Sequence, residues 1–379
     1  MSPLTSPARL GRWAPPLALA AIWVTMTALN PRFMSAVNLT NLTLQIVAVG
    51  AIAVAVVLVL LIGEIDLSVG AVSGFGAAVV AVLSVKAGWP AAPAILSGLA
   101  TGACVGLLHA LMVTRVGVPS FVVTLAGLLT WQGALLLVLG DTGTVNINDT
   151  GLVGIAGTFL APELGWALAA AFTGAAVAVV GLRARQSTVG HVGGRRDASP
   201  WNSWPWLVGS VGAIVAVAVF NADRGVPLAV VLFLVLLAGG DLVMRRTRLG
   251  RHAVATGSDA SAARRAGISV DRIRMVVFSL ASVLAVTGGI LAASRLLAVN
   301  QSSGGTDVML TAVAAAVIGG TSLFGGRGSV WSALLGSLVV GSLANGLDLL
   351  GASPAIRLIV TGSVLAIAVG LDTWARRSG

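Results

Sequence analysis

The sequence is poor in charged residues and in the residue types that build most catalytic and metal sites. Only 9% of its 379 residues are Asp, Glu, Lys or Arg, and it has one cysteine and three histidines. A soluble domain carries roughly 25% charged residues, and a surface with far fewer would expose large apolar patches and aggregate. The single Cys104 excludes an intramolecular disulfide and a multi-cysteine metal site. These shortages exclude an ordinary soluble domain.

Signatures of catalysis are missing as well. No histidine belongs to an H-E-x-x-H pattern, and no G-x-S-x-G elbow occurs. His109 lies near the end of an apolar run. An ionisable residue inside a membrane can be functional, but we prefer the alternative that a neighbouring carbonyl satisfies its ring. The only lysine, Lys86, is followed by Ala87, whereas a P-loop needs G-K-[ST]. We therefore expect no enzyme, no metal and no cofactor bound by this chain, and any ATP hydrolysis on a separate one.

Apolar residues dominate what is present. The apolar types make up 57% of the chain and glycine contributes 48 residues, which is too much apolar surface for a disordered protein. A helix crosses the hydrocarbon core in about 20 residues. Twelve apolar runs of about that length can be read: 14–29, 43–63, 67–85, 91–113, 121–140, 164–182, 206–220, 226–244, 275–299, 308–324, 328–350 and 354–371. The sequence predicts one domain over 1–379, an all-α polytopic transmembrane bundle with about 10–12 membrane segments, some of them discontinuous and broken by glycine.

The basic residues indicate how the bundle is oriented. Alternating the runs from a cytoplasmic N-terminus leaves all but five of the 23 basic residues inside, which is the bias of the positive-inside rule. The five outside are Arg32, Lys86, Arg224, Arg295 and Arg357. The formal charge of +10 is divided among short clusters, so no continuous patch for nucleic acid results. Both termini are expected in the cytoplasm, together with a flexible Gly-, Ser- and Arg-rich loop over 183–205 and a larger polar loop over 245–274.

The loop over 245–274 contains a short helix signal. Ser258 and Asp259 can cap a helix over 260–265, and Gly267 can end it in a left-handed conformation. A short helix of small residues beside a membrane suits docking into a groove of a partner. The alternative is an ordinary basic loop that satisfies the positive-inside rule, but a capped, alanine-rich helix does not follow from that rule.

Family resemblance begins at this helix. Ser261-Ala262-Ala263 followed by Gly267 resembles the E-A-A-x-x-x-G coupling motif of ABC-importer permeases, with Ser261 where the motif has Glu. The segment 63–70, GEIDLSVG, resembles their G-x-I-D-L-S-V-G signature, 318–329 resembles a second glycine-rich signature, and 118–127 a third family segment. Length and the runs around 164–220 resemble the xylose type within the ribose/xylose branch. The resemblance implies an ATPase-coupling set of Gly257, Ser258, Asp259, Ser261, Ala262, Ala263, Arg264 and Gly267.

The glycine-rich breaks supply the other candidate residues. Breaks in apolar helices occur where discontinuous helices line a pathway, and glycine also allows helices to pack closely. The structural glycines are Gly63, Gly70, Gly319, Gly320, Gly325 and Gly326. Candidates for a substrate path are Asp66, Ser68, Thr124, Trp131, Gln132, Thr321, Ser322 and Asn345. Two alternatives stay open: Asp66 as a helix cap, which we prefer to substrate contact, and Gln132 as a hydrogen bond between helices.

The resemblance implies a permease subunit of an ATP-driven importer of a monosaccharide, xylose or a similar pentose. Its partners would be a second permease copy, cytoplasmic P-loop ATPases that hold ATP and magnesium, and an extracytoplasmic sugar-binding protein, all at the bacterial inner membrane. Alternatives are a related permease for an autoinducer-2-like sugar, a nucleoside or a branched-chain amino acid, or a self-sufficient secondary transporter. The last is disfavoured because the acids lie mostly at the ends of the runs, not deep within them as ion coupling requires.

The bias of the basic residues makes a test of orientation possible. We expect single cysteines at positions 196 and 377 to react only from the cytoplasmic side, and a cysteine at position 148 only from the outside. Labelling of sealed cells with a membrane-impermeant thiol reagent measures this, and external labelling at position 196 would overturn the orientation.

Overall fold

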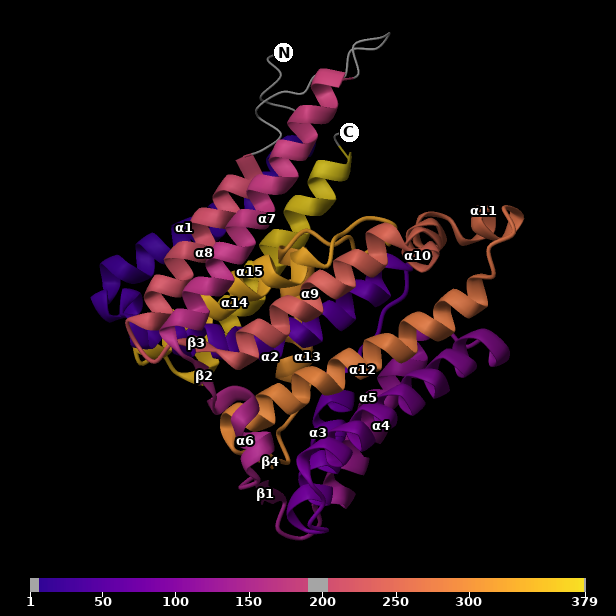
Figure 1. Cartoon of the computed structure of the whole chain (residues 1–379). Coiled ribbons are helices and arrows are strands. Elements are labelled where there is room, and N and C mark those ends of the chain that lie inside the picture. Colours follow the sequence, from indigo (N-terminus) through magenta and orange to yellow (C-terminus); the bar gives the residue numbers. More distant parts are fainter. Residues whose placement is uncertain (1–6, 190–203, 378–379) are drawn as a thin grey trace.

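The computed structural model describes residues 7–189 and 204–377, and it is helical almost throughout (Figure 1). The α-helices of these residues are α1 Pro7–Leu29, α2 Ala36–Leu61, α3 Val69–Val85, α4 Ala91–Leu111, α5 Ser120–Leu139, α6 Thr150–Gly157, α7 Pro162–Val189, α8 Trp204–Asn221, α9 Leu228–Arg246, α10 Arg248–Ser258, α11 Ala260–Arg265, α12 Val270–Leu296, α13 Thr306–Ile318, α14 Trp331–Leu349 and α15 Pro354–Arg377. A 3-10 turn, Pro31–Met34, follows α1, and a π-helical turn, Met112–Val116, follows α4.

Each of the twelve apolar runs corresponds to one helix. Within the described residues, seven helices are long and apolar enough to cross a membrane: α2, α4 with its π-turn, α5, α7, α9, α12 and α14. Shorter apolar helices are α1, α3, α8, α13 and α15. The expected all-α polytopic bundle is confirmed, and the chain is a multi-pass membrane protein by the length and composition of its helices.

Three boundaries differ from the expectation. The helix that corresponds to the run over 308–324 is shorter than expected, because α13 ends at Ile318 and residues 319–330 form a glycine-rich loop before α14. α7 continues to Val189, into the loop expected over 183–205, and residues 190–203 of that loop lie outside the described part of the chain. The polar loop over 245–274 is largely helical, since it contains α10, α11 and the adjoining ends of α9 and α12.

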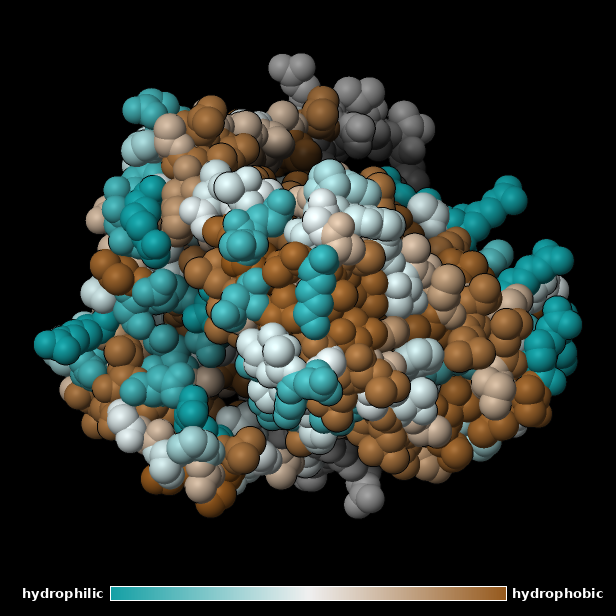
Figure 2. All heavy atoms as spheres, turned by 90° about the horizontal axis from the view of Figure 1, so that it is seen from below, coloured by the Kyte–Doolittle hydropathy of each residue, from teal (hydrophilic) through white to brown (hydrophobic). Residues whose placement is uncertain are grey.

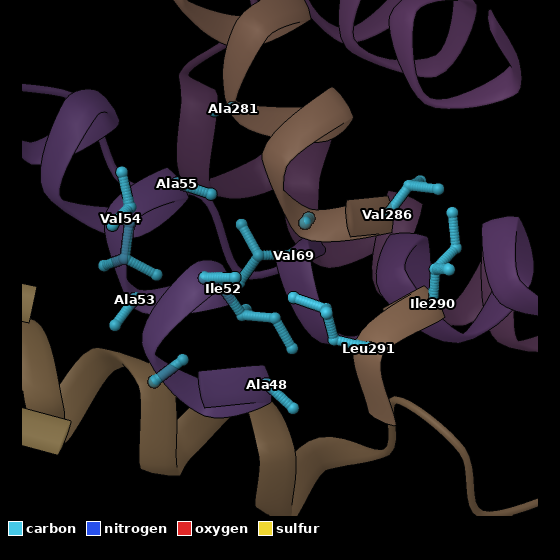
Figure 3. Close-up of a cluster of buried hydrophobic side chains, with 14 of the residues drawn as sticks. Ala48, Ile52, Ala53, Val54, Ala55, Val69, Ala281, Val286, Ile290 and Leu291 are labelled. Atoms are coloured by element: carbon cyan, nitrogen blue, oxygen red, sulfur yellow. The ribbon is translucent and has the colours of Figure 1, made fainter. Parts of the chain in front are cut away.

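Helix α2 lies at the centre of the bundle. It is apolar on every side, as a helix enclosed by other helices must be, and each of its residues from Gly50 to Leu61 is buried. Helices α3 and α12 pack against it through small and β-branched side chains, which Figure 3 shows gathered between the three helices. At Gly288 of α12 a Cβ would lie 2.8 Å from the carbonyl oxygen of Ala48, so the two backbones nearly touch. Large apolar side chains also cover much of the exterior, as lipid contact requires (Figure 2).

The connections gather at two opposite ends. At the strand end, β1 (Thr144–Asn146) pairs antiparallel with β4 (Ala298–Asn300), and β2 (Phe159–Leu160) with β3 (Val226–Pro227). The α11 end carries α10, α11, the break between α2 and α3, and the loop over 319–330 (Figure 1). The strands come from loops that alternation of the apolar runs puts on one side of the membrane, and the α11 end from loops that it puts on the other.

The crossing of α3 and α12 predicts a sharp cost for a larger side chain. A Cβ at Gly289 would overlap the carbonyl oxygen of Ser73, and backbone cannot move aside as a side chain can. We expect Gly289→Val to lower the free energy of unfolding by at least about 1–3 kcal/mol, measured as the thermal midpoint of the detergent-solubilised protein. Gly239→Val in α9 is the matched control, because no heavy atom lies within 4 Å of a Cβ there. Equal midpoints for the two variants would contradict the packing argument.

Candidate functional site

Helix α11 has the bounds that the sequence predicts, and Asp259 caps it. The expectation of Ser258 as a second cap is wrong, because Ser258 ends α10 and its hydroxyl donates to the carbonyl of Val254. The Oδ1 atom of Asp259 accepts hydrogen bonds from the amides of Ser261 and Ala262, at 2.8 and 2.9 Å. At the other end Gly267 has a φ of +81°, its amide donates to the carbonyl of Arg264, and the next amide, of Ile268, donates to the carbonyl of Ala263. These bonds form a complete Schellman motif, so both ends of this six-residue helix are closed by its own residues.

The cap also fixes the charge of Asp259. Donation from the amide of Ala262, ahead of that from Ser261 and the nearby Arg265, holds the pKa of the Asp259 carboxyl below its usual value. A carboxyl whose pKa is lowered by folding stabilises the folded state above its ordinary pKa, and that contribution is lost as the pH falls through the lowered value. The cap of α11 is therefore present at neutral pH.

The two alanines of the coupling motif face in different directions. Ala262 is exposed, together with Ser261 and Arg264, whereas Ala263 is only 4% exposed and packs within its own chain. Successive residues of a helix cannot share a face. Ala262 is therefore free to contact a partner, whereas Ala263 packs α11 onto its own chain. Arg264 forms an ion pair with Asp271 at 3.3 Å.

Three glycine segments, remote in the sequence, meet beside α11. A Cβ at Gly257 would overlap the carbonyl oxygen of Leu61, and one at Gly325 would lie 2.7 Å from the Cα of Gly63. The amide of Gly326 donates to the carbonyl of Leu61 at 3.1 Å. We call the contact of 61–63, 257–258 and 325–326 the glycine junction. It joins the end of α10 to the end of α2 and to the loop over 319–330, backbone against backbone.

The remaining glycines have separate roles. A Cβ at Gly70 would lie 2.9 Å from the carbonyl oxygen of Gly304, and one at Gly319 would overlap the carbonyl oxygen of Ser332. Gly320 has no heavy atom within 4 Å of a Cβ, but its φ is +102°. The prediction of close packing is wrong for Gly320, where glycine is needed for the left-handed backbone instead.

Four of the polar candidates surround the break between α2 and α3. Asp66 and Ser68 are in the break, and the hydroxyl of Thr124 accepts from the amide of Leu67 at 3.1 Å. Oδ1 of Asp66 accepts from the amide of Ser68 at 2.8 Å and so holds the turn that leads into α3. The N-cap position of α3 is Ser68, so the expectation that Asp66 caps this helix is wrong. Trp131 reaches the same group of residues from α5, through His109.

The other polar candidates lie elsewhere. Thr321 and Ser322 are buried in the loop over 319–330, where the hydroxyl of Ser322 accepts from the amide of Phe324. Asn345 exchanges two side-chain hydrogen bonds with Asn38, at 2.9 and 3.1 Å, and so joins α14 to the first turn of α2. That turn and the break lie at opposite ends of α2, roughly 40 Å apart at 1.5 Å per residue. Gln132 is half-buried and makes no hydrogen bond within the described residues.

His109 is the residue whose role the sequence did not reveal. Its ring contacts no carbonyl, contrary to expectation: Nε2 accepts from the indole Nε1 of Trp131 at 2.9 Å, and Nδ1 lies 3.4 Å from Oγ of Ser68. His109 is 3% exposed, and Gly127 provides its space, because a Cβ there would lie 2.5 Å from Nε2. An ionisable residue inside a membrane run is itself a pointer to function, and that signal was present in the sequence.

The break is also tied to α12 by charge. Nη2 of Arg274, in the first turns of α12, lies 2.5 Å from Oε1 of Glu64, whose side chain is 11% exposed. Ion pairs this well shielded resist separation, since either charge left alone would be poorly solvated. Within the described residues no three His, Cys, Asp or Glu side chains come together as metal ligands.

A multi-pass bundle with discontinuous helices and a capped surface helix joined to them is an architecture that membrane transport proteins use. Comparison with known families identifies the protein family. The chain belongs to the family described as "Branched-chain amino acid transport system / permease component", which matches residues 38–369. It is therefore a permease, not an enzyme.

Relatives with known names are similar over nearly the whole chain. The xylose transport system permease protein XylH of Escherichia coli (strain K12) is 35% identical over 95% of this chain and 91% of its own length. The ribose import permease protein RbsC of the same organism is 30% identical over 94% and 92%, and the fructose import permease protein FrcC of Rhizobium meliloti 29% over 92% and 81%. No solved structure matches.

The glycine junction leads to a prediction about transport. Gly257→Ala puts a methyl group against the carbonyl oxygen of Leu61 and the amide of Gly326, so α10 must move away from α2. We expect uptake in reconstituted vesicles to fall about tenfold or more, because a closely packed contact has no void to accept the added atom. Gly239→Ala, at an open position of α9, is the control. Unchanged uptake by Gly257→Ala would show that the junction plays no part in transport.

Proposed function

We propose that this chain is the permease subunit of an ATP-driven ABC importer for a monosaccharide, xylose or a similar pentose. The observation that carries the proposal is the capped α11 helix, which exposes Ala262. The residues just before this helix, 257–258, belong to the glycine junction. Such a helix suits docking on a partner, and the junction gives its movement a direct route to the ends of α2 and α3. The names of the relatives, which are permeases for xylose, ribose and fructose, support a sugar as cargo.

The α11 end faces the cytoplasm in this proposal, and both termini lie there. The arginines of α9, α10 and α11 gather at that end, as the positive-inside rule requires. A cytoplasmic P-loop ATPase, with its ATP and magnesium, would contact the coupling set 257–267. A sugar-binding protein would dock at the opposite, strand end, at the inner membrane of a bacterium. Two permease copies would enclose the path, each with its own ATPase.

The route of the movement follows from the contacts. A displacement of α11 pulls on α10, whose Gly257 touches the backbone of Leu61 at the end of α2. From there the Glu64–Arg274 ion pair connects the break to α12, and the hydrogen bond from the amide of Ser68 to Asp66 connects it to the start of α3. Since these contacts involve backbone or shielded charge, they transmit a displacement instead of absorbing it. The permease itself needs no catalytic group, because hydrolysis takes place on the ATPase.

Reconstitution with the ATPase and the binding protein tests the proposal. We expect ATP-dependent uptake of xylose, and Ala262→Trp should weaken ATPase association and abolish most uptake while membrane insertion stays intact. An added indole at an exposed docking position has no space in a closely packed contact. Ala178→Trp, an exposed alanine within α7 that lies away from both ends of the bundle, is the control. Normal uptake by Ala262→Trp with a fully associated ATPase would remove α11 from the coupling contact, and ATP-independent uptake would overturn the importer assignment.

A further inference from the structure

A groove runs along the membrane segments α3, α4 and α5, which lie together at one side of the bundle (Figure 1). Its volume is about 620 Å³, and it is lined by Phe75, Ser97, Ala100, Thr101, Cys104, Val105, Leu108 and Trp131. Phe75 and Trp131 are stacked, with ring centroids 5.5 Å apart and planes 22° apart. Small-molecule sites have this character, apolar and aromatic with a few polar groups. No Asp, Glu, Lys or Arg lines the groove, so it suits a neutral ligand.

The indole of Trp131 is held by a chain of buried hydrogen bonds. An indole N–H can only donate, so Nε2 of His109 must carry a lone pair, and the proton of the neutral ring is on Nδ1. That proton faces Oγ of Ser68, whose own hydroxyl donates to Oδ1 of Asp66 at 2.6 Å. His109, Ser68 and Asp66 are all buried, and Gly127 leaves room for the imidazole. Each hydrogen bond from Trp131 to Asp66 therefore donates in the same direction, from the groove to the break.

These hydrogen bonds turn the N–H edge of the Trp131 indole inward, away from the groove. With Nε1 donating to His109, the part of the ring system that borders the groove is apolar. The two hydroxyls in the groove complement it: Oγ of Ser97 donates to the carbonyl of Pro93, and Oγ1 of Thr101 to that of Ser97. Each hydroxyl thus keeps its oxygen lone pairs as acceptors. A sugar has an apolar C–H face that can lie on an aromatic ring and O–H donors that suit such acceptors.

We propose that His109 is a positioning residue that orients Trp131 as a stacking surface for a neutral sugar in this groove. The proposal rests on the proposed function, and it names the part of the path where the sugar contacts the permease. Because the last acceptor of these hydrogen bonds is Asp66 in the break, the orientation of Trp131 is linked to the same segment that the glycine junction contacts. A movement of the break would then change the sugar surface.

Cys104, the single cysteine of the chain, is exposed in this groove and reports on its occupancy. The experiment follows the rate at which a water-soluble methanethiosulfonate reagent labels Cys104 in the complete transporter, permease with ATPases and binding protein, in nanodiscs. We expect saturating xylose to slow labelling, and Trp131→Ala to abolish this protection. His109→Leu should raise the xylose concentration for half-maximal protection by about three- to tenfold, in the range that one aromatic contact contributes. His109→Gln should restore it, because its amide can accept from the indole and donate to Ser68.

Controls separate the proposal from other occupants of the groove. Trp166→Leu, an exposed tryptophan of α7, should leave protection unchanged. Labelling only by a lipid-soluble maleimide would assign the groove to lipid, and a disulfide between the Cys104 residues of two permeases would assign it to the second copy; either result overturns the proposal. Equal protection in His109→Leu and wild type would overturn the positioning role. ATP-driven xylose uptake without protection of Cys104 refutes this proposal alone, whereas absence of any sugar uptake refutes the proposed function.

Discussion

Close approach of backbones around α2 is the constraint on which the rest of the structure depends. Inside a bilayer, lipid is as apolar as leucine, so helices associate by van der Waals packing and by small residues that let them come close. Helix α2 is buried at every residue from Gly50 to Leu61, and α12 reaches it at Gly288, where only a hydrogen fits beside the carbonyl of Ala48. Gly289, on the next face of α12, meets α3 in the same way. The three helices therefore behave as one rigid block.

A rigid block determines where movement can occur. The break at 62–68 and the loop at 319–330 are not held by helical hydrogen bonds, and each contributes residues to the glycine junction. The junction is made of carbonyls, amides and α-carbons, which have no rotamers to absorb a displacement. Proteins amplify small shifts at a site because packed interfaces are bistable and not continuously deformable. A push on α10 at Gly257 would reach the break with little loss.

The sequence was most informative where local chemistry decides the structure. The apolar runs predicted every long helix, and the caps predicted both ends of α11, because Asp259 and Gly267 act within a few residues of themselves. It was least informative where a contact joins distant segments. The residues around Ala263 in the sequence do not predict that its side chain is buried. Likewise, β1 pairs with a strand more than 150 residues away. The partners of His109 come from α5 and the break. Its position near the end of an apolar run indicates neither of them and predicts only a neighbouring carbonyl.

Under the proposed function, the polar groups of the break connect the α11 end to the proposed sugar path. Polar atoms at membrane depth persist only where each finds a partner, and a broken helix supplies unpaired amides that carboxylates can satisfy. Glu64 pairs with Arg274 of α12, while Asp66 accepts from the amide and the hydroxyl of Ser68 and is the last acceptor of the hydrogen bonds that begin at Trp131. Two acids two residues apart thus connect one side of the break to the α11 end and the other to the groove. Under the proposed function, the work of the ATPase reaches the sugar path through the position of these few residues, and no ion has to bind in the membrane.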